Sequence, residues 1–178
     1  MNLLSTTERA GILKDIIFRS SIPGVSHLAK ELRLSKGMVS AYLSSLGRQG
    51  VLKKSGRNYL VLDTPVTKAL RIFFNVSAFR PVFFRRFGFI RAAGLYGSAA
   101  RGENTTESDI DVWIKIRPQP DSQLARLTTA LSKQINNIKI LLLDDKKIAR
   151  LKRDDLNFYH SIVFGSIILY GDTDAIWL

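Results

Sequence analysis

The 178-residue sequence contains no cysteine and no long run of apolar residues. Without thiols, neither a disulfide framework nor a thiolate metal site can form, which fits an intracellular protein. Apolar runs such as FGFI and ILLL are far shorter than the roughly 20 residues that cross a bilayer. The N-terminus, MNLLSTTERAG, lacks the basic start and apolar stretch of a signal peptide. We therefore expect a soluble cytoplasmic protein with no membrane partner.

Acidic residues are also missing from one long stretch of the chain. Residues 71–101 contain six arginines and no acid, and residues 1–70 contain eleven Lys or Arg against four Asp or Glu. From residue 102 onward bases and acids nearly balance, so the first hundred residues carry the net charge of +12. A field of this sign favours polyanionic partners such as nucleic acid or nucleotides. A generally basic surface that keeps the protein soluble is the alternative.

Capping residues and apolar periodicity predict three helices and a hairpin over residues 5–62. Ser5 and Glu8 have the spacing of a capping box at the start of a first helix, about 6–19. A short helix follows at 25–32, and Ser35 is a suitable N-cap for a third helix that ends near Gly47 or Gly50. The segment VLKKSGRNYLVL then predicts a β-hairpin.

Residues 25–61 resemble the winged helix-turn-helix of many bacterial and archaeal regulators, because helix, turn, helix and wing arrive in order. In that motif the third helix lies in the major groove of DNA and the wing reaches the phosphates or the minor groove. The resemblance implies a DNA contact surface made of two groups: Lys36, Ser40 and Ser44 on the outward face of the recognition helix, and Lys53, Lys54 and Arg57 on the wing. A winged helix used for protein interaction is the alternative.

A helix at 65–76 is predicted to link two domains, because Pro65 suits a first helical turn. The expected organisation is a DNA-binding domain at 1–64, the linker helix at 65–76 and a second domain at 77–178. The arginine-rich stretch SAFRPVFFRRFGF lies at this boundary. A helix starting near Pro81 would bury Phe83, Phe84 and Phe87 in the second domain, although these rings could instead stack on bases between the arginines.

The second domain begins with a strand, a turn and a second strand. Ile90 to Tyr96 and Asp109 to Ile116 are the strands, and Gly97 to Gly102 forms a turn that opens a short helix. Asp109 and Asp111 are two apart on a strand, so their side chains project from one face about 7 Å apart along the chain. Such a pair of carboxylates can converge on one metal cluster. A helix over 121 to about 136, a strand at 138–143, one or two helices and a final strand in SIILYG complete the domain.

The stretch LYGSAARGENTTESDIDVWI resembles the polymerase-β-like nucleotidyltransferases, particularly their minimal archaeal and bacterial members. The family pattern is Gly-Ser, a short helix with Arg-Gly and, about ten residues later, Asp-x-Asp. The resemblance covers about residues 77–171 and implies that Asp109 and Asp111 are catalytic and bind Mg²⁺ or Mn²⁺. The resemblance also implies that four residues bind the nucleotide: Gly97, Ser98, Arg101 and Gly102. Divalent ions neutralise the phosphates and align the attacking oxygen in phosphoryl transfer.

The third carboxylate that this family usually supplies from the next strand is missing. A helical crossover implies that the strand 138–143 is parallel to the aspartate strand, so the acid is expected near its start. Lys139 occupies that position, and we expect it to pair with the aspartates or touch phosphate. Asp144 and Asp145 lie at the opposite end, roughly 16 Å away at about 3.3 Å per residue. His27 and His160 are too isolated in sequence to suggest a metal site.

The sequence therefore predicts an α+β protein with a winged helix-turn-helix followed by an α/β nucleotidyltransferase domain with a small mixed sheet. One hypothesis is an enzyme that transfers a nucleoside monophosphate from a nucleoside triphosphate to a hydroxyl of unknown identity with Mg²⁺. The other is a transcriptional regulator or antitoxin-like protein whose degenerate nucleotidyltransferase domain senses nucleotide or binds a partner. DNA is a partner in both, with a protein target or cognate toxin as a further one. A homodimer is plausible because such regulators usually read two half-sites.

Overall fold

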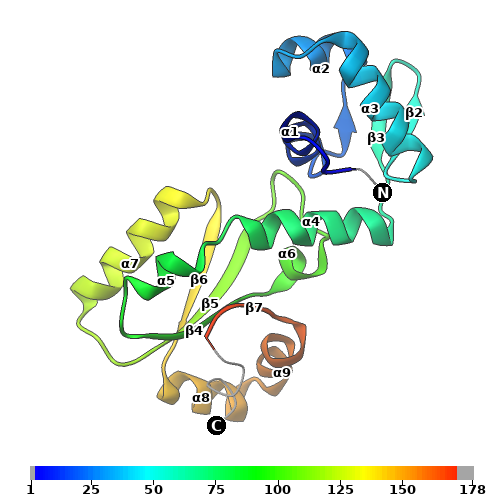
Figure 1. The fold of residues 1–178 in the computed structure, drawn as a ribbon. Helices are drawn as coiled ribbons and strands as arrows, with labels where there is room; N and C mark the ends of the chain where they lie inside the picture. The colour runs from blue at the N-terminus through cyan, green and yellow to red at the C-terminus, as the bar shows by residue number, and fades with distance from the viewer. Residues whose placement is uncertain (1–2, 172–178) are drawn as a thin grey trace. The chain divides into compact units, whose positions relative to one another are not determined.

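A computed structural model describes residues 3–171 of the chain (Figure 1). The chain divides into two compact units, Met1–Arg71 and Ile72–Leu178. The division falls within helix α4 (Pro65–Ser77), close to the predicted linker helix. Among the described residues no helix is both long and apolar enough to span a membrane.

The N-terminal unit contains three helices and a small antiparallel sheet. The helices are α1 (Thr7–Ile16), α2 (Val25–Leu32) and α3 (Lys36–Arg48). The strands β1 (Ser21–Ile22), β2 (Leu52–Ser55) and β3 (Asn58–Val61) form a sheet of order β1-β3-β2. The β2–β3 hairpin confirms the predicted one, and its register pairs Ser55 with Asn58 around the Gly56–Arg57 turn.

Three details of this unit differ from the sequence prediction. Thr6 rather than Ser5 caps α1, because its side chain accepts the Arg9 amide at 3.2 Å, and the helix ends at Ile16. The expected break after α1 contains the short strand β1, whose backbone pairs with β3. Helical spacing groups Met38 with the apolar residues of α3, since Tyr42 lies four residues on, but its side chain is 39% exposed. It lies in the first turn of α3.

The C-terminal unit is built on a four-stranded mixed sheet of order β6-β5-β4-β7. Its strands are β4 (Ile90–Leu95), β5 (Ile110–Ile116), β6 (Ile138–Leu143) and β7 (Ile167–Tyr170). Strand β4 is antiparallel to both β5 and β7, whereas β5 and β6 are parallel, as the crossover through a helix predicts. The small mixed sheet expected from the sequence is thus confirmed.

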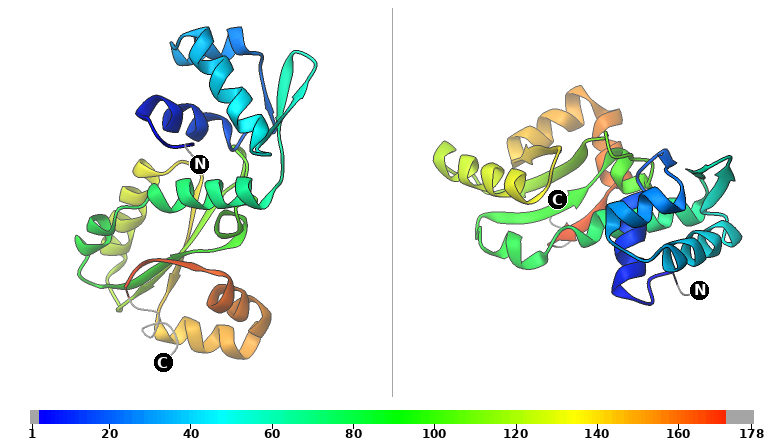
Figure 2. Two further views of the ribbon diagram at one scale, coloured as in Figure 1. Left: turned by 45° about the vertical axis from the view of Figure 1, so that its right-hand side comes forward. Right: turned by 90° about the horizontal axis from the view of Figure 1, so that it is seen from above.

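The helices of this unit cover both faces of the sheet (Figures 1 and 2). Helix α5 (Pro81–Arg85), α6 (Gly97–Arg101) and α7 (Asp121–Gln134) supply buried residues to one core, which also contains Val112 and Ile114 of β5. Helices α8 (Asp145–Asp154) and α9 (Leu156–Gly165) pack against the opposite face around Trp113. Alternation along β5 therefore directs Asp111 to the same side as Trp113.

The phenylalanine cluster after α4 belongs largely to the core, as predicted. Phe83 and Phe84 are buried, at 9% and 0% exposure, and Phe79 packs beside them. Phe87 differs, because it is only partly buried at the margin of the same cluster. It follows the end of α5, where the chain turns back toward β4, so one side of its ring stays open.

Candidate functional site

The turn between β4 and α6 lies directly against the carboxylate of Asp111. The Tyr96 amide donates to the Asp111 carbonyl at 3.0 Å, which fixes the end of β4 beside the start of β5. Gly97 then has a φ of +68°, and a Cβ on it would stand 2.7 Å from Asp111 Oδ2. Only glycine combines this backbone conformation with so close an approach. The structure thus brings the Gly-Ser turn and the second aspartate together.

Lys139 lies beside both aspartates. In the parallel register of β5 and β6 it is the partner of Asp111, and its ammonium contacts Asp109 Oδ2 at 2.6 Å. The position of the expected third acid therefore holds a cation, and of the predicted pairing with the aspartates the ion pair with Asp109 is observed. The ion pair is largely open to solvent, since the side chains of Lys139 and Asp109 are 66% and 44% exposed.

Burial and neighbouring charge perturb the acid–base groups around this turn. Burial raises the pKa of Asp111, and the neighbouring Asp109 raises it further, while Lys139 opposes both effects. The hydrogen bond to Asp109 raises the pKa of Lys139, so its ammonium is charged at neutral pH. Burial also raises the pKa of the Tyr96 phenol, with Asp111 as a second cause. Burial therefore makes the Asp111 carboxyl harder to ionise than an exposed aspartate, despite the ammonium of Lys139 nearby.

A buried pair of asparagines supports the turn, and sequence reasoning missed it. Asn75 on α4 donates through Nδ2 to the Ala99 carbonyl of α6 at 2.9 Å and to Asn104 Oδ1 at 2.8 Å. In turn, Asn104 Nδ2 donates a hydrogen bond to Asn75 Oδ1 at 3.2 Å. Both side chains are almost fully buried, at 6% and 2%. The available signal was an amide within the apolar run IFFNV, because a polar side chain on a buried helix face needs a specific partner.

The other predicted nucleotide-binding residues follow Gly97 within the same short segment. Ser98 is half-buried in the first turn of α6, and its carbonyl accepts the Glu103 amide at 2.9 Å. Gly102 ends the helix with a φ of +68°. Arg101 Nε pairs with Glu103 Oε2 at 2.7 Å and remains 60% exposed. Through this ion pair Arg101 joins the end of α6 to an acid of the following loop.

In the part of the chain that the structure describes, no second acid cluster substitutes for the missing carboxylate. Asp145 lies at the far end of β6, where it pairs with Lys115 Nζ at 3.3 Å, and Asp144 caps α8 by accepting the Lys147 amide at 2.7 Å. Within residues 3–171 no group of three or more His, Asp or Glu side chains is arranged to hold a metal ion. Asp109 and Asp111 are thus left as two carboxylates with an ammonium beside them.

The residues predicted to contact DNA are all exposed on the N-terminal unit. Lys36, Ser40 and Ser44 follow one another at intervals of four along α3 and are exposed, whereas the stripe of Val39, Tyr42, Leu43 and Leu46 is buried. Lys53 and Lys54 lie on β2, and Arg57 lies in the hairpin turn. A hollow of about 460 Å³ between the start of α2 and the hairpin is lined by Lys54 and Arg57, with Ser26 and His27 on its α2 side.

The sequence model of the family described as Polymerase beta, Nucleotidyltransferase matches residues 82–175, more than half of the chain. The chain belongs to this family. The matched range contains the Gly97 turn, both aspartates and every strand of the C-terminal sheet. We therefore refer to the C-terminal unit as the nucleotidyltransferase domain.

No curated protein matches the sequence. Among solved structures, the chain is similar to a toxin–antitoxin crystal structure with AMP-PNP, at 13% identity and a TM-score of 0.37 over 64% of this chain and 79% of that chain. It is also similar to a protein assigned as a nucleotidyltransferase from Sulfolobus solfataricus, at 14% identity and a TM-score of 0.37 over 60% of this chain and 89% of that chain. Neither likeness is close enough to support an inference about this chain.

Proposed function

We propose that this chain is a DNA-binding regulator. Its nucleotidyltransferase domain binds a nucleoside triphosphate but does not transfer a nucleoside monophosphate from it. The observation that carries the proposal is Lys139, which pairs with Asp109 at 2.6 Å and stands opposite Asp111 in the sheet. Two carboxylates and one ammonium leave the site with a single net negative charge. Divalent ions prefer sites rich in anionic oxygen ligands, so these residues do not fit a two-metal centre.

The same residues are suited to hold phosphate. Gly97 leaves the backbone accessible at the turn, and the Ser98 hydroxyl and neighbouring amides can donate to phosphate oxygens. Lys139 adds a fixed positive charge beside the turn, and the exposed Arg101 can leave Glu103 for a ligand that carries more negative charge. Binding of a triphosphate as its Mg²⁺ complex remains part of the proposal, with Asp111 as the nearest acid to the turn.

A transferase that moves a nucleoside monophosphate to a hydroxyl with Mg²⁺ or Mn²⁺ is the second candidate. The close approach of Gly97 to Asp111 favours it, because this approach places a phosphate-binding turn beside a carboxylate. In this reading Asp109 and Asp111 are the catalytic and metal-binding residues. It requires the Lys139 ammonium to leave Asp109 when the ion enters.

Calorimetry and a release assay on the full chain separate the two candidates. We expect each nucleoside triphosphate to bind with or without Mg²⁺, and no pyrophosphate to be released in the presence of a cell extract. Lys139→Glu should raise the affinity for Mn²⁺ alone by about tenfold or more, because it changes the local charge by two units. Lys146→Glu, an equal charge change at an exposed position of α8, is the matched control. Pyrophosphate release by the unaltered protein, abolished by Asp111→Asn, would decide for the transferase.

The DNA-binding half of the proposal rests on the N-terminal unit as a winged helix-turn-helix. We assign residues 1–64 to this domain, 65–76 to a linker helix and 77–178 to the nucleotidyltransferase domain. The exposed α3 residues and the wing cations support the assignment, as does the cationic hollow between the wing and the start of α2. Phosphate contacts by such cations give affinity that falls with salt.

Retardation of the DNA upstream of its own gene tests this half. We expect tight binding at low salt and a steep loss of affinity as salt rises. The double variant Lys53→Glu, Lys54→Glu should lower the log–log salt slope by about 1.8, since each phosphate contact contributes about 0.9 on duplex DNA. An unchanged slope, or no retardation by the unaltered protein at moderate salt, contradicts the assignment.

The resemblance of the sequence to minimal nucleotidyltransferases, together with the antitoxin-like hypothesis, extends the proposal to a protein partner, either a cognate toxin or a protein target. A homodimer would allow two recognition helices to read two half-sites. Sedimentation of the chain alone and with its candidate partner measures both. A monomer that binds DNA as a single copy excludes the dimer.

A further inference from the structure

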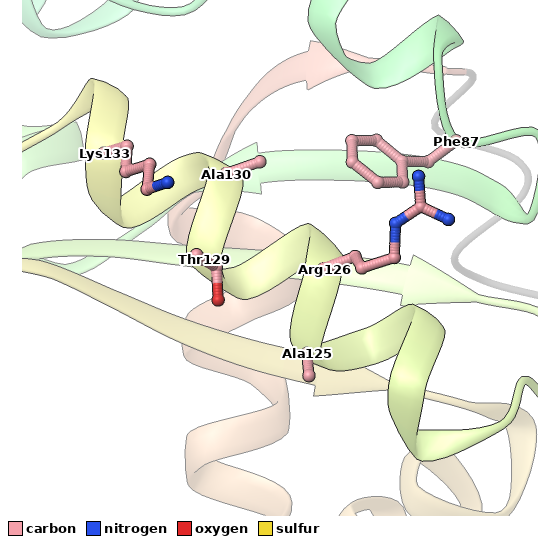
Figure 3. A pocket seen from close by; sticks show the side chains of 6 residues that line it. All are labelled: Phe87, Ala125, Arg126, Thr129, Ala130 and Lys133. Carbon is pink, nitrogen blue, oxygen red and sulfur yellow. The ribbon is translucent and has the colours of Figure 1, made fainter.

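A hollow on the α5–α7 side of the nucleotidyltransferase domain is not used by the proposed function. It has a volume of about 430 Å³ and lies along α7, with Phe87 as its wall on the other side. Arg126, Lys133 and Thr129 project from α7 around it, with Ala125 and Ala130 beside them (Figure 3). The volume falls within the range of about 300–1,000 Å³ that is usual for ligand pockets.

Two cations, Arg126 and Lys133, line this hollow, and no acid does. Neither Arg126 nor Lys133 forms an ion pair with any acid of residues 3–171, and the exposed Arg85 and Arg86 immediately precede Phe87 in the chain. Arg126 and Lys133 are seven residues apart on one helix, so about 10 Å separates them along its axis. An extended polyanion could contact both cations at once.

Phe87 supplies a flat aromatic surface at the same place. Its ring packs against Phe83 at 5.6 Å and Phe89 at 5.9 Å between centroids, which holds it in one orientation. Its remaining surface faces the hollow, and the Arg126 guanidinium lies beside the ring (Figure 3). The sequence offered two roles for the phenylalanines, core packing and base stacking. Phe83 and Phe84 follow the first, whereas Phe87 has a surface free for the second.

We propose that this hollow binds a single-stranded nucleic acid, with one base stacked on Phe87 and phosphates held by Arg126 and Lys133. Cations that follow the backbone, together with an aromatic ring for the base, are the usual elements of single-strand binding without base readout. The hollow is separate from the triphosphate site, because α7 packs on the sheet face that carries Val112 and Ile114, opposite the face of Asp111. Binding at this hollow therefore does not require nucleotide binding at the Gly97 turn.

Fluorescence anisotropy of the full chain with a labelled oligodeoxythymidine of about 12 nucleotides tests this site. We expect Arg126→Glu, Lys133→Glu to weaken binding and to lower the log–log salt slope by about 1.4, at about 0.7 for each phosphate on a single strand. Phe87→Leu retains an apolar side chain against Phe83, and should weaken binding at least about 5-fold through lost stacking. Lys146→Glu, Arg150→Glu makes the same charge change on exposed α8 positions and should alter neither value.

Duplex DNA and the wing variant separate this site from the N-terminal unit. Lys53→Glu, Lys54→Glu should weaken duplex binding and leave oligodeoxythymidine bound, while the α7 double variant should do the reverse. Circular dichroism and thermal unfolding check that each variant is folded. Equal losses from the α7 and α8 double variants would overturn the inference, as would an unchanged affinity in Phe87→Leu. Displacement of the oligonucleotide by polyglutamate at equal charge would assign the surface to an acidic protein and overturn it as well.

Discussion

The structure allows the effect of a substitution at Gly97 on stability and on triphosphate affinity to be estimated. Gly97→Ala forces an L side chain into a φ of +68°, which costs roughly 1–2 kcal/mol. The new Cβ would also stand 2.7 Å from Asp111 Oδ2. That oxygen is at the end of a side chain that can rotate, so the collision adds little free energy and moves the carboxylate. We expect a moderate loss of stability and a large loss of triphosphate affinity.

Tryptophan fluorescence measures the loss of stability, because Trp113 is fully buried in the C-terminal unit and becomes exposed when that unit unfolds. At about 4–8 °C for each kcal/mol in a domain of this size, Tm should fall by roughly 4–16 °C. Gly88→Ala is the matched control in the same unit, since a Cβ there meets no atom within 4 Å. Its Tm should stay close to that of the unaltered protein.

Calorimetry with a nucleoside triphosphate measures the loss of triphosphate affinity on the same two variants. We expect Gly88→Ala to bind as the unaltered protein does and Gly97→Ala to bind at least about tenfold more weakly, equivalent to about 1.4 kcal/mol. If Gly97→Ala keeps both its Tm and its affinity, the turn does not hold phosphate beside Asp111, and the reasoning about the site is wrong.

Two further predictions concern groups around the same turn. Because burial raises the pKa of Asp111 in the folded state, that state binds its proton more tightly, and stability falls as pH rises through the range above the ordinary Asp value of 3.8. Asp111→Asn should therefore be more stable than the unaltered protein at pH 7 in urea titrations, with the difference vanishing below that range; a less stable variant at pH 7 would contradict this. Asn104→Ala leaves the Asn75 amide buried without one of its partners and should cost about 1–3 kcal/mol in the same titrations. Asn136→Ala, at an exposed position, is its control, and equal effects of the two would exclude a structural role for the pair.

The sequence alone determined most of the elements and the position of Asp111 beside the Gly-Ser turn, although Asp109 precedes β5 rather than lying on it. Helix α2 and strand β6 have the predicted bounds, because Gly24 and Arg33 delimit α2, and the turn at Asn137 and the helix cap at Asp144 delimit β6. Strand alternation placed Asp111 on one face and Val112 on the other. These features depend on local periodicity and capping, which neighbouring residues encode.

Tertiary packing decided what lies between segments that are distant in the chain. The pairing of Asn75 with Asn104 joins residues that no local pattern relates, since α4 and the loop after α6 meet only in the folded domain. Likewise, apolar spacing made Phe83, Phe84 and Phe87 equivalent, and only the end of α5 and the position of α7 left Phe87 partly open. Lys139 depends on both the sequence and the tertiary structure. Its identity was readable in the sequence, but the 2.6 Å contact with Asp109 required the parallel register of β5 and β6, because main-chain hydrogen bonds across the sheet fix which residues face each other.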